Sequence, residues 1–288
     1  MKNTMEDRKM TEKKKGFFIT KKQIIACIIS LLLLFITIFL MVGILTADKE
    51  YAIGEKRIQI PIFLYHHLIE GDIEDVKIDY METTTDQFEK QVTGFQKLGY
   101  HFITYDDLIQ YAHGEKKLPK KVALLTFDDG AEDNYTILFP IIKRLNVPVT
   151  LNIIDDMIGQ PTYLTWDQIR EMKESGLVTI ASHSKDHQKL NEQDLTTFLT
   201  NTDIAFQHME EQIGKQSYQI FTYPCGLYRD DEIEALKEKQ VIQNLTDNKI
   251  NNSDDLDLSR LHRSYPLNDS VEKMLLKIYY RDIRYGGK

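Results

Sequence analysis

Two hydrophobic patterns alternate along most of the chain, and together they predict its secondary structure. Short apolar runs are typical of buried strands, whereas apolar residues recurring every three or four positions indicate amphipathic helices. The runs predict strands at 58–66, 101–104, 122–127, 149–154, 177–182, 219–223, 241–246 and 259–264. The longer spacing predicts helices at 88–98, 132–145, 165–173, 195–213, 232–239 and 271–283.

Alternating strands and helices indicate an α/β fold with a parallel sheet and helices outside it. Seven or eight strands in one domain favour a barrel over an open sheet. Two helix starts carry the signature of a capping box, Thr84 with Gln87 and Thr165 with Gln168. In (β/α) barrels, active residues lie at the carboxyl ends of the strands, so polar residues at those positions are candidates for function.

Residues 23–47 break the alternation, because this run of 25 residues is mostly Ile, Leu and Phe and has no charge. A bilayer core needs about 20 apolar residues, and a cleavable signal peptide has a shorter apolar region. We therefore predict a basic cytoplasmic tail at 1–22, a transmembrane anchor at 23–47, a stalk at 48–57 and a folded domain at 58–288. The eight Lys and Arg of the tail predict a single-pass cell-membrane protein whose C-terminal domain lies outside the cell.

The charge of the C-terminal domain argues against nucleic acid as a partner. The whole chain has a net charge of −8 and residues 1–22 carry +5, so residues 48–288 carry −13. Nucleic-acid phosphates need Lys and Arg, whereas a neutral or cationic glycan suits an acidic domain. The two cysteines, Cys27 in the apolar run and Cys225 in the domain, are too far separated to pair. The domain is thus expected to rely on its hydrophobic core.

Asp128 and Asp129 directly follow the predicted strand at 122–127, and Gly130 comes next. Adjacent side chains on a strand point to opposite faces, and glycine lets the backbone turn. One carboxylate can therefore hold a metal while the other faces a substrate. The alternative is a helix N-cap, for which a single Asp is sufficient. Two consecutive Asp residues and a Gly after a buried strand indicate a functional site.

His183 and His187 lie four residues apart, just after the predicted strand at 177–182. In a helical turn this spacing places both imidazoles on one face, which suits a single metal ion. A solvated surface pair is the alternative. Two His and one Asp, with a position open for water, form the ligand set of a catalytic Zn²⁺ site. The other Asp would then be a base beside the water that the metal activates.

Other candidates also fall near predicted strand ends. His66 and His67 end the first strand, and at most one of them faces the barrel mouth, where it would be a general acid. His262 is a second candidate for the acid, or else a strand residue facing solvent. Tyr223 precedes a rigid Pro-containing turn. Trp166, the only Trp, is either a platform on which a sugar stacks or a core residue.

These motifs resemble those of the polysaccharide deacetylase family, also called the NodB-homology domain or carbohydrate esterase family four. The resemblance covers roughly residues 58–266. The matching motifs are Thr126-Phe127-Asp128-Asp129-Gly130 and His183-Ser184-Lys185-Asp186-His187. The resemblance implies a deformed (β/α) barrel of seven or eight strands. It also implies Asp128 as catalytic base, with Asp129, His183 and His187 as ligands of a divalent metal, usually zinc. A partly matching third motif would supply the backbone N–H of Tyr223 to the oxyanion.

Two features depart from the usual pattern of this family. The family often has an Arg in its third motif that tunes the base, and residues 217–226 contain none. Arg260 and Arg263 are the candidates to replace it. The usual catalytic His lies after the metal motifs, whereas here a Tyr-His-His sequence opens the domain. That opening resembles the circularly permuted branch of poly-N-acetylglucosamine deacetylases, in which the His directly after Tyr is the acid. The resemblance thus favours His66, with His262 in reserve.

The implied function is metal-dependent hydrolysis of N-acetyl groups on a cell-surface or extracellular amino-sugar polymer, which releases acetate. The partner would be peptidoglycan, poly-N-acetylglucosamine or a chitin-like oligomer, and the sequence does not distinguish them. A glycoside hydrolase is one alternative, but it needs two carboxylates about 5–9.5 Å apart across the scissile bond. A metal-binding but inactive glycan-binding module is the other alternative. Such a module would ordinarily lack the base or the acid, whereas this chain has both Asp128 and His66.

Overall fold

The computed structural model describes residues 20–47, 49–72, 74, 79–189 and 193–285, without the side chains of 39–47 and 285. The chain divides into two units, residues 1–45 and 46–288, and the second is called here the C-terminal domain. Nearly all of the basic tail predicted at 1–22 lies outside the described residues.

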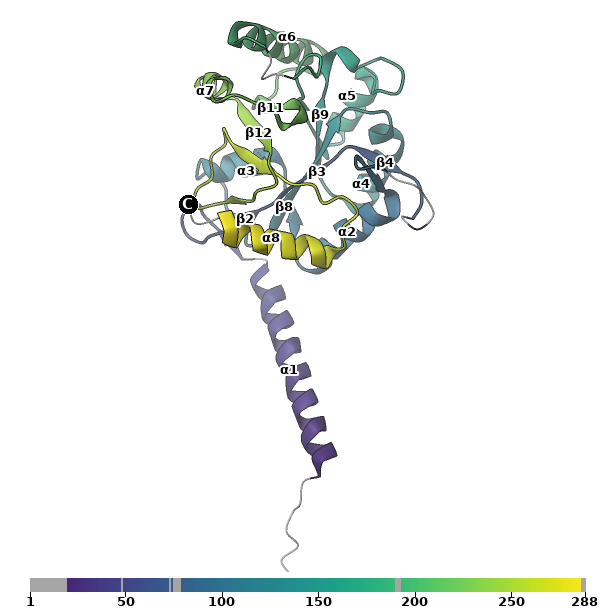
Figure 1. Cartoon of the computed structure of the whole chain (residues 1–288), viewed down its shortest axis with the longest axis vertical. Coiled ribbons are helices and arrows are strands. Elements are labelled where there is room, and N and C mark those ends of the chain that lie inside the picture. The colour runs from purple at the N-terminus through teal and green to yellow at the C-terminus, as the bar shows by residue number, and fades with distance from the viewer. Residues whose placement is uncertain (1–19, 48, 73, 75–78, 190–192, 286–288) are drawn as a thin grey trace, which may run out of the picture. The chain divides into compact units, whose positions relative to one another are not determined.

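The helix α1 (Lys21–Ala47) coincides with the predicted apolar run (Figure 1). Its 27 residues give a length of about 40 Å, which exceeds the roughly 30 Å of a bilayer core. All its described side chains are exposed, including those from Ile24 to Ile38, so no described part of its surface packs into a protein core. By length and composition α1 qualifies as a membrane span, and an N-terminal signal sequence meets the same criterion.

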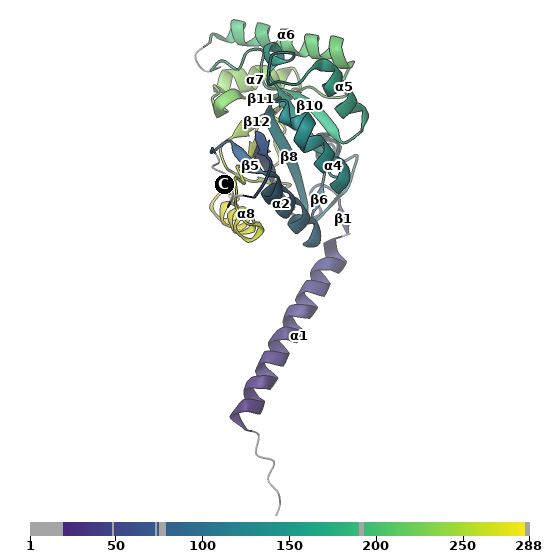
Figure 2. The same ribbon diagram turned by 90° about the vertical axis from the view of Figure 1, so that its right-hand side faces the viewer.

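The C-terminal domain is built on seven parallel strands in the order β14-β12-β11-β10-β9-β8-β3 (Figures 1 and 2). Their bounds are β3 (Ile62–Tyr65), β8 (Val122–Asp129), β9 (Val149–Ile153), β10 (Val178–Ser182), β11 (Ile220–Thr222), β12 (Ile242–Thr246) and β14 (Leu261–Arg263). Two backbone hydrogen bonds of Ser264, with Leu64 N (3.0 Å) and Ile62 O (2.9 Å), bring the first and last strands together. The predicted α/β barrel of seven or eight strands is therefore confirmed.

Helices follow most of the strands and surround the barrel (Figures 1 and 2). They are α2 (Thr85–Lys97), α3 (Tyr105–Ala112), α4 (Phe139–Leu145), α5 (Trp166–Glu174), α6 (Leu195–Ile213), α7 (Asp230–Glu238) and α8 (Val271–Tyr285). A π-helical turn, Asn134–Leu138, leads into α4, and 3-10 turns lie at Asp155–Met157 and Pro224–Gly226. The remaining strands are β1 (Glu50–Tyr51), β2 (Gln59–Ile60), β4 (His67–Ile69), β5 (Glu82–Thr84), β6 (His101–Phe102), β7 (Leu118–Pro119) and β13 (Asn251–Asn252).

Local sequence signals account for several element ends. The capping box predicted at Thr165 and Gln168 is present in full at the start of α5. At the start of α2, Thr84 accepts a hydrogen bond from the amide of Gln87 (3.2 Å). The Gln87 side chain donates instead to the carbonyl of Asp269 (2.7 Å), so only half of that predicted box forms. The helix α3 was not predicted, although Thr104 and Asp107 form a capping box at its start.

The segment predicted as a stalk is part of the folded domain. The strand β1 pairs antiparallel with β7, with Glu50 opposite Pro119 and Tyr51 opposite Leu118. Farther along, Arg57 donates a hydrogen bond to Asp282 of α8 at 2.6 Å. The polar residues that suggested a stalk belong instead to an edge strand and a surface ion pair. The prediction of a stalk at 48–57 is therefore wrong for residues 49–57, the part of it that the structure describes.

Candidate active site and metal centre

The carboxyl ends of the barrel strands bring the two sequence motifs together. The strand β8 continues through both acidic residues, and it ends in a left-handed turn at Asp129 (φ 74°) and Gly130 (φ 76°). A left-handed conformation is uncommon for a residue with a Cβ and has an energetic cost. Simple alternation along the strand would have placed the two carboxylates on opposite faces. Because the backbone turns at Asp129, both Asp128 and Asp129 approach the same histidine, His183.

Asp129, His183 and His187 form a cluster with the dimensions of a metal site. Oδ1 of Asp129 lies 3.5 Å from Nε2 of His183 and 3.5 Å from Nε2 of His187. Two ligands of a tetrahedral zinc ion, each at about 2.0–2.1 Å, lie about 3.3 Å apart. Oδ1 of Asp129 is buried and accepts no hydrogen bond from the described residues. The donor set, its spacing and this unpaired oxygen fit a divalent cation.

A hydrogen bond on the side of the ring away from Asp129 fixes the orientation of His183. Its ring is buried, and Nδ1 donates to the backbone carbonyl of Thr222 at 2.9 Å. That bond leaves Nε2 as the unprotonated nitrogen, directed at Asp129. Metal-binding histidines generally use one ring nitrogen in this way, which sets the tautomer and the direction of the other.

The loop that carries the second histidine is not the helical turn predicted from the His-x-x-x-His spacing. Ser184 (φ 69°) and His187 (φ 58°) are left-handed, and the amide of His187 donates to Oγ of Ser184 at 3.0 Å. The 3-10 turn after β9 holds this loop, because the amides of Asp155 and Asp156 donate to the carbonyls of Ser184 and Lys185. Several unfavourable backbone conformations at one place are typical of functional sites.

Replacing His183 by Ala is expected to remove the bound metal and the activity together, because this histidine would supply one of three protein ligands. The measurement is metal content by elemental analysis of the purified protein, with His113→Ala as the matched control. His113 is exposed on the surface and should be replaceable without loss of metal. Full metal occupancy in His183→Ala would contradict the assignment.

Asp128 lies beneath the metal cluster and is held by a buried arginine. Arg263 is fully buried, and its Nη1 and Nη2 donate to Oδ1 (2.7 Å) and Oδ2 (2.8 Å) of Asp128. Burial is the largest single influence and would raise the pKa of Asp128. The charge of Arg263, the charge of His183 and the hydrogen bonds from Arg263 together outweigh it and hold that pKa well below its usual range. Asp128 is therefore ionised, and of the two candidate arginines it is Arg263 that contacts it. Arg260, the other candidate, pairs with Asp230 on the surface (3.0 Å).

The two oxygens of Asp128 have different surroundings. Oδ1 accepts a second hydrogen bond, from Nδ2 of Asn152 at 2.6 Å, whereas Oδ2 lies 3.8 Å from Nε2 of His183. Oδ1 is thus occupied by two donors, and Oδ2 faces the metal cluster. This arrangement assigns Oδ2 as the oxygen able to accept a proton from a molecule bound in front of the cluster.

A directional chain of buried hydrogen bonds ends at Oδ1 of Asp128. The hydroxyl of Tyr105 donates to Asn244 (2.7 Å), and Nδ2 of Asn244 donates to Oγ1 of Thr222 (3.0 Å). Thr222 then donates to Oδ1 of Asn152 (2.9 Å), which leaves the amide nitrogen of Asn152 for Asp128. Each donor points toward Asp128 because an ionised carboxylate only accepts. This network of hydrogen bonds therefore holds Asp128 in one position and in its ionised state.

Thr222→Val is expected to lower kcat about tenfold, because it removes one hydroxyl link from the chain that positions a charged group. Metal content and KM should stay near the wild-type values, since the carbonyl of Thr222 that holds His183 is unchanged. Thr222→Ser keeps the hydroxyl and should recover most of the rate. Steady-state kinetics of the two variants check this, and equal rates for Val and Ser would contradict it.

The three candidate histidines for the acid have different environments. His66 is buried at the catalytic end of the barrel, and its ring stacks on Tyr265 at 6.0 Å. Burial lowers the pKa of His66, while the charges of Asp128 and Asp129 oppose that effect. His67 instead is partly exposed and its Nδ1 lies 3.1 Å from Asp133.

His262 lies on β14 directly before Arg263, so its side chain points to the opposite face of the strand from the arginine that contacts the base. It pairs there with Asp247 (Nδ1 to Oδ2, 2.9 Å). The charges of Asp128 and Asp129 both act on the pKa of His66, which favours His66 over His262 as the candidate acid.

The two remaining candidates have structural contacts. The amide of Tyr223, expected to bind the oxyanion, donates at 3.3 Å to the carbonyl of Asn244, and its hydroxyl donates to Gln243 at 2.7 Å. That occupied N–H does not favour the oxyanion role. Trp166 is half-buried at the start of α5, where it packs against the core and, at 5.2 Å between ring centroids, against His208. These contacts favour the core alternative for Trp166.

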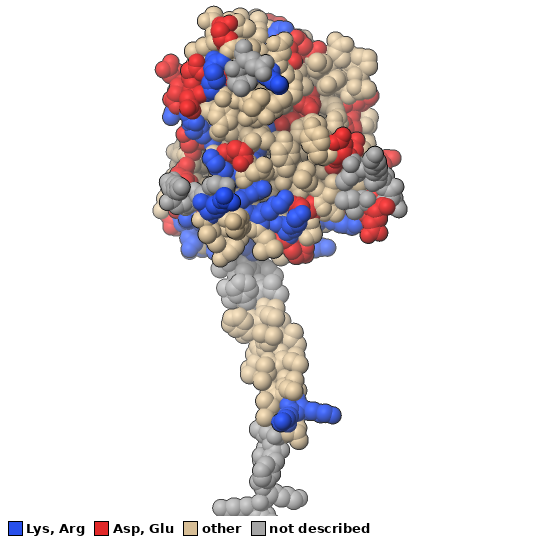
Figure 3. Space-filling model, in the orientation of Figure 1, with Lys and Arg blue, Asp and Glu red and all other residues tan. Residues whose placement is uncertain are grey.

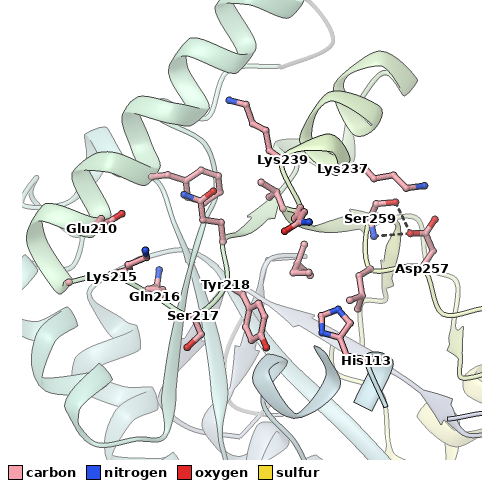
Figure 4. Close-up of a pocket in the computed structure, with 17 residues that line it drawn as sticks. His113, Glu210, Lys215, Gln216, Ser217, Tyr218, Lys237, Lys239, Asp257 and Ser259 are labelled. Carbon is pink, nitrogen blue, oxygen red and sulfur yellow. Dashed lines mark hydrogen bonds between the residues drawn. The ribbon is translucent and has the colours of Figure 1, made fainter. Parts of the chain in front are cut away.

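A separate cavity of about 750 Å³ lies at the amino ends of β11 and β12 (Figure 4). Its lining includes His113 and Tyr218, whose rings lie edge to face at 6.5 Å, and also Lys215 and Lys237. The metal cluster lies at the carboxyl ends of the strands, so this cavity is at the other end of the barrel and is not the catalytic mouth.

Comparisons with known proteins agree with this geometry. The polysaccharide deacetylase family matches residues 115–242. The chain is 28% identical over 210 residues to the putative polysaccharide deacetylase YxkH of Bacillus subtilis, covering 73% of this chain and 72% of that protein. It is 26% identical over 227 residues to the poly-beta-1,6-N-acetyl-D-glucosamine N-deacetylase of Staphylococcus epidermidis, covering 75% and 77%.

Solved structures with the same fold include the Streptococcus pyogenes deacetylase PplD in complex with acetate. Its TM-score is 0.70 at 24% identity, covering 77% of this chain and 99% of that one. The IcaB structure from Ammonifex degensii has a TM-score of 0.65 at 22% identity, covering 77% and 97%. At these identities the structures show the fold, and the residues that the family matches, 115–242, include both motifs. Residues 115–242 therefore match the polysaccharide deacetylase family, and the likeness to that family that the motifs predicted is confirmed.

Proposed function

We propose that this protein is a metal-dependent deacetylase that removes N-acetyl groups from an extracellular amino-sugar polymer and releases acetate. The proposal rests on one observation, the position of an ionised carboxylate beside the candidate metal site. Asp128, a carboxylate held ionised by Arg263, has its Oδ2 3.8 Å from a histidine of the Asp129, His183 and His187 cluster. A base next to a cation site is the arrangement that hydrolysis of an amide requires.

Different residues of the chain would have different roles in the hydrolysis. Asp129, His183 and His187 would hold a divalent cation, with zinc favoured by the donor set. That cation supplies Lewis acidity to the oxygens in contact with it. Oδ2 of Asp128 accepts a proton from the attacking water. His66 donates a proton to the nitrogen of the departing amine, so the products are acetate and a free amino sugar.

The proposed substrate is a β-linked N-acetylglucosamine polymer. The S. epidermidis relative is named for poly-beta-1,6-N-acetyl-D-glucosamine, and the likeness to it extends over 75% of this chain. The Tyr65-His66 opening, which resembles the permuted branch, lies in the buried first strand of the barrel and at its end. The net charge of −13 on residues 48–288 also suits a product whose amines become cationic as the reaction proceeds.

We further propose that α1 anchors the protein in the cell membrane. The tail at 1–22 carries eight basic and three acidic residues, which favours a cytoplasmic N-terminus and an extracellular C-terminal domain. Protease treatment of intact cells tests the topology, because only an external domain is degraded while the membrane remains closed.

Acetate release from N-acetylglucosamine oligomers tests the reaction and separates it from its alternatives. Incubating the full chain with β-1,6- and β-1,4-linked oligomers should release acetate without shortening the oligomers. A chelator should stop the reaction, and added Zn²⁺ should restore it. Shortened oligomers would indicate a glycoside hydrolase. Binding without either product from any N-acetylated polymer would indicate an inactive glycan-binding module.

A further inference from the structure

The last helix of the domain has an apolar face that no described part of the chain covers. Leu276, Tyr279, Tyr280 and Ile283 of α8 are 61–66% exposed. At 100° per residue these four positions fall within an arc of about 100°, so they form one continuous stripe. The opposite face of α8 packs into the core through Met274 and Ile278. Exposed apolar patches of this kind mark interaction surfaces.

Basic residues line one side of this stripe. Lys273, Lys277, Arg281 and Arg284 occupy the arc between the stripe and the buried face, while the acidic residues within α8 are Glu272 and Asp282. Figure 3 shows Lys and Arg side chains gathered over α8. Lys273 and Lys277 both approach one carboxylate, that of Asp269, so the cluster keeps a positive excess. This positive region lies on a domain whose residues 48–288 sum to −13.

We propose that this face of α8 lies on an anionic lipid surface. Apolar and aromatic side chains with adjacent Lys and Arg are the features of helices that lie in the plane of a bilayer interface. Tyrosine is favoured at that depth, and the basic residues attract anionic headgroups. A glycan polymer is a weaker fit, because Leu276 and Ile283 offer it no hydrogen bonds.

The position of α8 along the chain supports a bilayer as the partner. Arg57 is hydrogen-bonded to Asp282 near the end of α8, and α1 ends at Ala47. Ten residues of extended chain reach at most about 36 Å. If α1 crosses the membrane as proposed above, the end of α8 is kept within that distance of the bilayer. The inference therefore rests on the proposed anchor and not on the proposed reaction.

Docking of α8 on the bilayer would set the direction in which the carboxyl ends of the barrel strands, and the active site there, face. Lys277 and Arg281 of α8 also line a cavity of about 550 Å³ together with Tyr80 and Tyr265. Tyr265 stacks on His66, the proposed acid. The active site and the bilayer-facing helix are thus connected by adjacent residues, so the enzyme would act on polymer close to the membrane surface.

The test uses a fluorescent reporter in the full chain, reconstituted in lipid nanodiscs. Trp166 is the only native Trp, so Tyr280→Trp adds one reporter on α8. Ile204→Trp is the matched control, because Ile204 is a 43% exposed residue of α6, which Figures 1 and 2 place at the opposite end of the domain. Brominated lipids quench tryptophan only at bilayer depth. We expect about twofold quenching of the added emission in Tyr280→Trp with anionic phosphatidylglycerol, and little in Ile204→Trp.

Charge and lipid controls complete the experiment. Lys273→Glu combined with Arg284→Glu should reduce the quenching of Tyr280→Trp, as should replacement of phosphatidylglycerol by phosphatidylcholine. Equal quenching in the α8 and α6 reporters would overturn the proposal. It would also be overturned if Tyr280→Trp changed only on adding N-acetylglucosamine polymer, or only at high protein concentration, which would indicate glycan binding or self-association. Incorporation of the chain into nanodiscs and acetate release are measured separately, so failure of the anchor or the reaction is distinguishable.

Discussion

Asp128→Asn is expected to reduce turnover by about 10²–10⁴-fold while the metal stays bound. The amide cannot accept a proton from the attacking water at neutral pH. The metal ligands Asp129, His183 and His187 are unchanged, so elemental analysis should find wild-type metal content. A variant that kept near wild-type kcat would show that Asp128 is not the base.

The surroundings of Asp128 predict a second effect of this substitution, on stability. Both carboxylate oxygens accept hydrogen bonds from Arg263, so an amide nitrogen at Oδ2 would face another donor across 2.8 Å. Leaving a buried arginine without its partner costs about 3–5 kcal/mol. The midpoint of thermal unfolding should therefore fall, and kinetics should be measured well below it.

A double variant separates the catalytic from the structural contribution of the Asp128–Arg263 pair. Arg263→Met in the Asp128→Asn background removes the unpaired charge, so the free energy of unfolding should recover toward the wild-type value. Turnover should stay low because the base is still missing. If stability and activity recovered together, the loss in Asp128→Asn would be explained by misfolding rather than by chemistry.

The strength of local hydrophobic periodicity explains which parts of the fold could be predicted. The helix α6 has the predicted bounds, 195–213, because nineteen residues of amphipathic pattern follow a capping Asp194 and end at Gly214. The strand at 122–127 was also recognised, but β8 continues for two more residues through Asp128 and Asp129. The helix α3 is only eight residues long, which is too short for its hydrophobic periodicity to be recognised in the sequence.

The site residues were recognised from their motifs, whereas their geometry depends on backbone turns. Strand alternation would separate Asp128 from Asp129, and helical spacing would align His183 with His187. In the structure, left-handed residues at Asp129, Ser184 and His187 replace both regular patterns. Left-handed conformations are uncommon for any residue other than Gly, even though Asp and His adopt them more often than most, so propensity does not predict them at these positions. The surrounding contacts hold them in place.

The residues that support the base were either missed or left undecided, because they come from distant parts of the chain. Arg263 is 135 positions from Asp128, and the sequence offered Arg260 as an equal candidate. Asn152, Thr222 and Asn244 are polar residues at fully buried positions of the strands β9, β11 and β12. A polar residue at a buried strand position needs a partner, and this signal could have identified them as parts of one network.

His66→Ala is expected to leave metal binding intact and to reduce deacetylation by about 10²–10⁴-fold, the usual effect of losing an acid–base group. Added imidazole should restore part of the rate, because removal of the buried His66 ring leaves a space of its size beside Tyr265. A general acid must be protonated, so the wild-type rate falls as pH rises through the pKa of His66. Burial lowers that pKa, so the alkaline limb should lie below the usual pKa range of a histidine and vanish in the variant.

The other two histidines provide the contrasting variants for this assignment. His67→Ala should be much milder, because that ring is bonded to Asp133 and partly exposed. His262→Ala should also be mild, because His262 points to the face of β14 opposite Arg263 and pairs there with Asp247, which follows β12. If His262→Ala lost the larger factor while His66→Ala was nearly silent, the acid would come from the C-terminal part of the chain. The resemblance of the first strand to the permuted branch would then be misleading about the catalytic acid.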